Sequence, residues 1–159
     1  MPVQQYVGRL TLALGFSVAV LVQPALSAQQ QAAAKIPISV WKTRTCGCCT
    51  LWVDHMRANG FDVKVQDVDD LGPLKRKLGV TPGLSSCHTA QAGRYVIEGH
   101  VPADVVRRLL KERPTTVVGV AVPGMPIGSP GMEVPGGGRQ AYAILTFDKA
   151  GQTTVYDKR

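Results

Sequence analysis

The first apolar stretch of the chain runs from Leu10 to Leu26 and is longer than any apolar segment that follows it. Arg9 and the amino terminus give it a thin positive flank, and small residues at 24–28 offer a cleavage point. This layout is typical of a secretory signal peptide, whereas a membrane span needs about 20 apolar residues. The sequence therefore predicts a signal peptide over residues 1–28 and an exported protein. The alternative is an uncleaved N-terminal anchor.

After a flexible lead-in at 29–36, the hydrophobic positions alternate between the short period of strands and the longer period of helices. One domain is expected over residues 37–159. Its predicted order is a strand at 36–41, a helix at 49–59, a strand at 61–68, a helix around 71–78, a hairpin of 86–90 with 95–98, and a helix at 102–112. This order predicts an α/β protein with a thioredoxin-like fold, in which helices flank a central mixed sheet.

Residues 117–138 are rich in glycine and proline and contain Met125 and Met132. A long irregular segment inside a compact domain is usually functional or disordered. We therefore expect a Gly/Pro/Met-rich loop inserted near the C-terminus. Apolar alternation returns at 141–147, and residues 153–156 are expected to pair with that strand.

Charge narrows the choice of partners. The chain carries 18 Lys and Arg against 11 Asp and Glu, a formal charge of +7. The basic groups at 75–77 and 107–113 lie in predicted helices, so we expect them on solvated faces. Because aromatic residues make up only 6% and do not interleave with the basic ones, nucleic-acid binding is not expected.

Three cysteines crowd the first predicted strand-to-helix junction, as Cys46-Gly47-Cys48-Cys49. Unpaired N–H groups at a helix start favour the thiolate, which is both a nucleophile and a metal ligand. Cys46 and Cys49 form a CxxC pair, but a third sulfur close by would invite disulfide scrambling. A third sulfur is useful for a soft metal, and thiolates select Cu(I), with zinc and iron–sulfur clusters as rivals.

Cys87 supplies a fourth sulfur, since the third strand of a thioredoxin plan begins beside the CxxC pair. The predicted metal ligands are therefore Cys46, Cys48, Cys49 and Cys87, with copper as the ion. A disulfide between Cys87 and one of the other three is an alternative. A structural zinc site or two plain disulfides remain open as well.

Further ligand candidates are His88, His100, Met125 and Met132. Strand alternation would send the side chain of His88 to the face opposite Cys87, which argues against it. His100 lies between a strand and a helix, where it could bind metal, cap the helix or face solvent. Thioether sulfur suits Cu(I), although a loop that packs its methionines on the domain is an equal alternative.

The chain resembles the DUF411 family, which includes the CopG-type periplasmic copper-resistance proteins. The resemblance rests on Cys-Gly-Cys-Cys at 46–49, Ser-Cys-His-Thr at 86–89, Glu-Gly-His-Val-Pro at 98–102 and the Pro-Gly-Met motif at 123–133. It implies a thioredoxin-like fold, a thiolate-bridged multinuclear Cu(I) cluster on the four cysteines, a periplasmic location and a role in copper resistance. Other periplasmic copper-handling proteins are implied partners, and interconversion of Cu(I) and Cu(II) is an implied activity.

An enzyme remains the competing interpretation. A thiol–disulfide oxidoreductase would use Cys46 as nucleophile and Cys49 as the resolving thiol. The extra cysteines argue against this activity. In thioredoxins a substrate-facing cis-proline directly precedes the third strand. Here the nearest proline, Pro82, lies five residues before Cys87, so that proline is missing. A copper oxidoreductase would combine both chemistries.

Overall fold

The computed structural model describes Met1 and residues 34–159 of the chain. The predicted signal peptide lies almost wholly outside the described residues. Within the part of the chain that is described, no helix is both long and apolar enough to cross a membrane.

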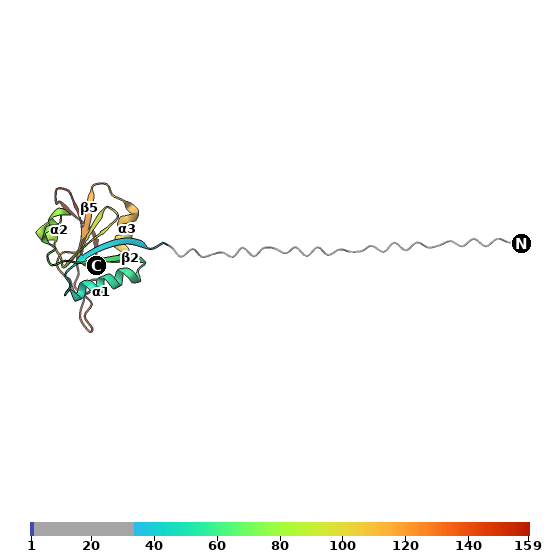
Figure 1. The fold of residues 1–159 in the computed structure, drawn as a ribbon, viewed down its shortest axis with the longest axis horizontal. Helices are drawn as coiled ribbons and strands as arrows, with labels where there is room; N and C mark the ends of the chain where they lie inside the picture. Colours follow the sequence, from blue (N-terminus) through green and yellow to red (C-terminus); the bar gives the residue numbers. More distant parts are fainter. Residues whose placement is uncertain (2–33) are drawn as a thin grey trace. The chain divides into compact units, whose positions relative to one another are not determined.

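Seven strands and three α-helices make up this part of the chain (Figure 1). In chain order they are β1 (Ile36–Lys42), α1 (Gly47–Ala58), β2 (Phe61–Asp67), α2 (Gly72–Lys77), the 3₁₀ turn η1 (Pro82–Leu84), β3 (His88–Ala92), β4 (Tyr95–Glu98), α3 (Ala103–Glu112), β5 (Val117–Ala121), β6 (Ala143–Asp148) and β7 (Thr153–Lys158). The prediction of an α/β protein with a mixed sheet is confirmed.

All seven strands join one sheet in the order β2-β1-β3-β4-β5-β6-β7. The β1/β2 and β4/β5 pairs are parallel and the other neighbours are antiparallel. The two parallel pairs are the ones joined through a helix, since a parallel connection needs a crossover. The predicted β3–β4 hairpin turns at Gly93, and β7 pairs with β6 as expected.

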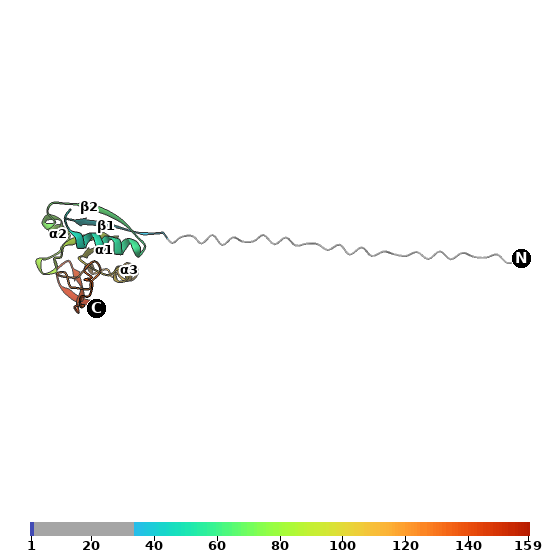
Figure 2. The same cartoon turned by 90° about the horizontal axis from the view of Figure 1, so that it is seen from below.

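The sheet has a core on each face. Trp52 and Met56 of α1 and Val106 of α3 belong to the larger core, together with Ile97 of β4. Val96, the neighbour of Ile97, belongs to a smaller core on the opposite face. Because successive strand residues point to opposite faces, α1 and α3 cover one face and η1 lies over the other. Figure 2 shows α1 lying along β1 and β2.

Two sequence-based expectations are wrong. The irregular segment does not start at Val117, because residues 117–121 form the valine-rich strand β5, which pairs in parallel with β4. Lys75 is not on a solvated face: its residue is 9% exposed, and its ammonium group lies inside the protein against Glu98. Residues 122–142, by contrast, contain neither helix nor strand.

Candidate metal centre

The helix half of the site lies where β1 leads into α1. Cys46 is the N-cap residue of α1, so Cys48 and Cys49 fall in its first turn, where backbone N–H groups lack helical partners. Cys46 and Cys49 are joined by a disulfide, and Cys49 is fully buried. Cys48 is a free, partly exposed thiol. Adjacent residues in the first turn thus direct their sulfurs differently: Cys49 into the disulfide and Cys48 toward Cys87.

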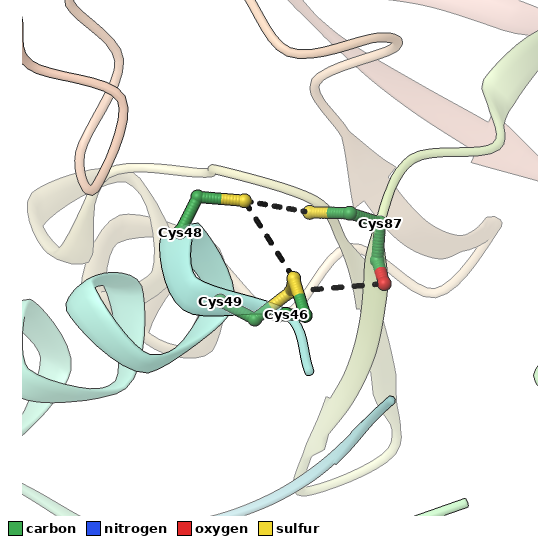
Figure 3. A group of neighbouring side chains, drawn as sticks. All are labelled: Cys46, Cys48, Cys49 and Cys87. Carbon is green, nitrogen blue, oxygen red and sulfur yellow. Dashed lines mark hydrogen bonds between the residues drawn. A yellow bond between two sulfur atoms is a disulfide. The ribbon is translucent and has the colours of Figure 1, made fainter. Parts of the chain in front are cut away.

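Strand pairing supplies the fourth sulfur. The last residue of β1, Lys42, pairs with the first residue of β3, His88, so Cys87 lies beside the start of α1. Figure 3 shows the Cys48 and Cys87 sulfurs pointing toward each other, at 3.9 Å, while the Cys48 sulfur is 3.6 Å from that of Cys46. The four sulfurs all lie within 4.8 Å of one another. Cys87 is a free thiol, which rules out the alternative of a Cys87 disulfide in this state of the protein.

Two histidines lie on the other side of Cys87. The Cys87 sulfur is 3.0 Å from Nε2 of His100 and 3.3 Å from Nδ1 of His88. The expectation that His88 faces away from Cys87 is wrong, because β3 begins at His88 and strand alternation does not extend to the residue before it. Both imidazoles are fully buried.

A buried ion pair holds the segment that carries Cys87. Lys75 of α2 and Glu98 of β4 are in direct contact, with side-chain exposures of 11% and 0%. The Glu98 carboxylate accepts hydrogen bonds from the Ser86 backbone N–H and the Thr89 hydroxyl, each at 2.7 Å. The Lys75 ammonium donates to the Ser86 carbonyl at 3.0 Å. Residues on both sides of Cys87 are therefore fixed to one buried network.

Two glycines allow the surrounding segments to approach closely. Gly99 has φ +71, and a Cβ there would lie 2.5 Å from the Ser86 side chain. Gly131 has φ +83, and a Cβ there would lie 2.7 Å from the backbone nitrogen of Trp52 and 2.8 Å from the carbonyl oxygen of Cys48. Only glycine fits such positions without displacement. The 122–142 loop is therefore packed directly on the first turns of α1.

Burial keeps the Cys87 and histidine groups neutral. It raises the pKa of the Cys87 thiol to about 12, and the neighbouring Cys48 adds to that rise. Burial also lowers the pKa of His100, and it lowers that of His88 well below its usual range. A thiol and two neutral imidazoles meet here, rather than the thiolate–imidazolium pair of a cysteine nucleophile.

The two candidate methionines lie on the 122–142 loop. Met125 is 51% exposed on the loop, and Met132 is partly buried in it. Among the described residues, the hydrogen bonds of the four cysteines include neither methionine. Nε2 of His55 accepts a hydrogen bond from the Ala103 backbone N–H at 3.2 Å, so this histidine serves the start of α3.

Sequence reasoning misses Lys75, Glu98 and Pro130, although each contacts the site. One signal does exist for Glu98: a carboxylate that ends the otherwise apolar run Tyr95-Val96-Ile97 of a strand must be buried with a partner. No comparable signal marks Pro130, whose carbonyl accepts a hydrogen bond from His100 at 2.8 Å.

Known proteins are similar to this chain in sequence and in overall structure. Residues 84–132 match the family model described as "Protein of unknown function, DUF411". A solved structure named "Copper resistance protein copG- Form 2" is 39% identical, with a TM-score of 0.74 over 79% of this chain and 98% of that one. The chain belongs to the DUF411 family and is CopG-like. Form 1 of the same protein is also 39% identical, with a TM-score of 0.73 and the same coverage. No curated protein sequence matches.

The kinds of donor atom in this DUF411 protein indicate which metal ions the site could bind. The cluster offers four sulfurs and two imidazoles and contains no carboxylate ligand among the described residues. Such soft and borderline donors suit copper or zinc and not the oxygen-seeking ions. A copper-related function and a metal-binding cysteine cluster are therefore consistent with each other.

Proposed function

We propose that this protein is an exported copper-binding protein that holds Cu(I) as a thiolate-bridged, multinuclear cluster in copper resistance or homeostasis. The observation that carries the proposal is the convergence of Cys46, Cys48, Cys49 and Cys87 within 4.8 Å. Four sulfurs so close together are suited to sharing several ions, since one thiolate can bridge two of them. The relatives named as copper resistance proteins support copper over zinc.

Loading the full cluster requires the reduced form of the protein. The Cys46–Cys49 disulfide offers no thiolates, and its reduction with two electrons and two protons returns two thiols. Each thiol that binds copper releases its proton, so the site takes up metal more readily as pH rises. Met125 and Met132 belong to the proposal as outer ligands from the loop that packs on α1.

The proposal includes a thioredoxin-like fold. Its support is the strand order β2-β1-β3-β4, with β1 parallel to β2, antiparallel β1/β3 and β3/β4 pairs, and a CxxC pair at the start of α1. It also includes a signal peptide over 1–28, a domain over 37–159 and a periplasmic location, for which the support is the apolar pattern of the N-terminal sequence.

Anaerobic titration of the reduced, purified protein with Cu(I) tests the copper proposal. We expect more than one copper per chain and protection of all four thiols. Cys48→Ser should abolish the bridged cluster, and Cys87→Ser should do so as well. Tight, stoichiometric binding that survives the loss of both cysteines would contradict the proposed ligand set.

The Cys46–Cys49 disulfide specifically favours a second candidate function, thiol–disulfide oxidoreductase. This activity would need Cys46 and Cys49 only, so insulin reduction should survive replacement of Cys48 and Cys87. Such activity, combined with no retained copper in the titration above, would favour the enzyme.

A further inference from the structure

The ring of His55, on α1, bonds to the first residue of a different helix, α3. Its Nε2 is 3.2 Å from the Ala103 backbone nitrogen. An N–H group in the first turn of a helix has no partner within that helix. Pro102, the N-cap residue of α3, has no side-chain atom that could accept a hydrogen bond from it. The imidazole therefore takes the place of an N-cap side chain for α3.

A second bond from α1 holds the same turn. Nε1 of Trp52 donates a hydrogen bond to the Val101 carbonyl at 2.9 Å. Because residues three apart lie on one face of a helix, Trp52 and His55 can bond to backbone groups on either side of Pro102. The indole N–H is a donor at any pH, whereas an imidazole nitrogen accepts a hydrogen bond only in the neutral ring. One of the two bonds therefore depends on pH.

Protonation of His55 would act against its bond in two ways. Nε2 would become a donor that faces the Ala103 N–H, which is itself a donor. The positive charge of the ring would also lie at the N-terminus of α3, where the helix dipole is positive. Since the residue is only partly buried, water can deliver the proton.

Charged side chains around the ring favour protonation, but burial opposes it more strongly. Burial lowers the pKa of His55, while Asp104 of α3 and Glu133 of the loop raise it, and the net direction is down. On α1 itself, Asp54 and Arg57 pair with each other at 3.3 Å. The folded protein therefore favours the neutral ring, and two carboxylates attract the imidazolium once it forms.

We propose that His55 is a pH-sensitive cap, which fastens the start of α3 to α1 while its ring is neutral and releases it when the ring is protonated. The inference stands apart from the proposed copper function, because no cysteine takes part. A histidine with a lowered pKa in the folded state contributes stability that is complete above its unfolded pKa of about 6.5. That stability is lost as the pH falls through the folded-state pKa.

NMR of the nitrogen-labelled, metal-free wild-type protein tests the bond itself. At about pH 8 we expect the ring proton of His55 on Nδ1, because Nε2 accepts from Ala103. As the pH is lowered, the Ala103 amide signal should shift with the same midpoint as the His55 ring, below about pH 6.5. A proton on Nε2 at about pH 8 would overturn the proposal, and so would an Ala103 signal that does not follow the ring.

His55→Gln and His55→Leu test the effect on stability. The Gln amide oxygen can accept the bond at any pH, whereas Leu has no acceptor. Urea denaturation between about pH 7.5 and pH 5 should show the folding equilibrium constant of the wild type falling more steeply than that of His55→Gln. The difference is at most about tenfold per pH unit, the limit for one proton.

His55→Leu is the matched control, because it removes the cap at every pH. It should be less stable than the wild type at about pH 7.5, and its pH dependence should equal that of His55→Gln. The other two histidines are present in all three proteins, so a difference in pH dependence belongs to His55. The same pH dependence in the wild type and His55→Gln would show that His55 is not a pH-sensitive cap.

Discussion

The two halves of the candidate metal centre are built in different ways. The helix half, Cys46 to Cys49, is four consecutive residues at the start of α1, with Cys48 partly exposed. The strand half, Cys87 with His88 and His100, is assembled from β3, the β4–α3 turn and the 122–142 loop, and both its imidazoles are fully buried. Local sequence determines the first half, and tertiary structure determines the second.

This difference predicts how each half should respond to amino-acid substitutions in the surrounding elements. Substitutions in α2 or β4 should disturb the strand half, because they remove contacts that hold the segment carrying Cys87. They should leave the Cys46–Cys49 disulfide able to form. The following experiments separate the two halves, beginning with the largest expected effect.

Lys75→Met should destabilise the metal-free protein by about 3–5 kcal/mol, because it leaves the Glu98 carboxylate buried without its cation. Urea denaturation measures the loss. Lys75→Met/Glu98→Leu should recover much of it, since replacing both partners removes the unpaired charge. If Lys75→Met alone were neutral, the network would not be what fixes the Cys87 segment.

Alkylation of Cys87 should be slow, because its pKa is raised to about 12 from an ordinary value near 8.5. A thiol with a raised pKa stays protonated, so the thiolate fraction of Cys87 at pH 8 is roughly a thousandfold lower than that of an ordinary cysteine. In Cys48→Ala with the disulfide intact, Cys87 is the remaining free thiol. Its rate with iodoacetamide should still be rising steeply at about pH 9–10, because burial is the larger cause and Cys48 the smaller. A plateau below about pH 9 would contradict this.

Gly131→Ala should cost about 2–4 kcal/mol, because it combines a positive φ with a Cβ too close to α1. Gly136 is the matched control: its φ is +69, but a Cβ there meets nothing within 4 Å. Gly136→Ala should therefore show only the backbone cost, about 1–2 kcal/mol. Thermal or urea denaturation compares the pair. Equal losses would mean that the loop does not press on the helix half.

Met125→Leu/Met132→Leu should have the smallest effect, a loss of Cu(I) affinity of at most about tenfold. The change keeps side-chain size and removes both thioethers. A chelator competition measures the difference. A loss as large as that of Cys87→Ser would place the methionines among the principal ligands.

Much of the fold can be predicted from the sequence, because most helices and strands have a characteristic spacing of apolar residues and end at recognisable Gly, Asn or Pro residues. Asn59-Gly60 marks the end of α1, and Pro102 marks the start of α3. Strand β5 escapes prediction because its five residues merge into the glycine- and proline-rich segment that follows. Its identity as a strand depends on β4, whose parallel pairing is invisible in local sequence.

For the site, residue chemistry alone points to the four cysteines, because their spacing and softness are visible in the sequence. The environment of Cys87 cannot be predicted in the same way. Lys75 and Glu98 are 23 residues apart, and three neighbouring basic residues give no reason to single out one of them as buried. The expectation for His88 fails because β3 begins at residue 88, two residues later than the strand expected at 86–90.

The pairing of Lys42 with His88 has a consequence for folding. An unfolded chain offers copper a three-cysteine segment at 46–49, while Cys87 lies 39 residues beyond Cys48. The Cys87 sulfur comes close to the other three only when β1 and β3 pair in the native register. An ion bound by both halves would therefore link these two strands across a long stretch of sequence. A ligand that prefers the native state shifts the folding equilibrium toward it. Copper bound as proposed should therefore reinforce the β1–β3 strand pair against local opening.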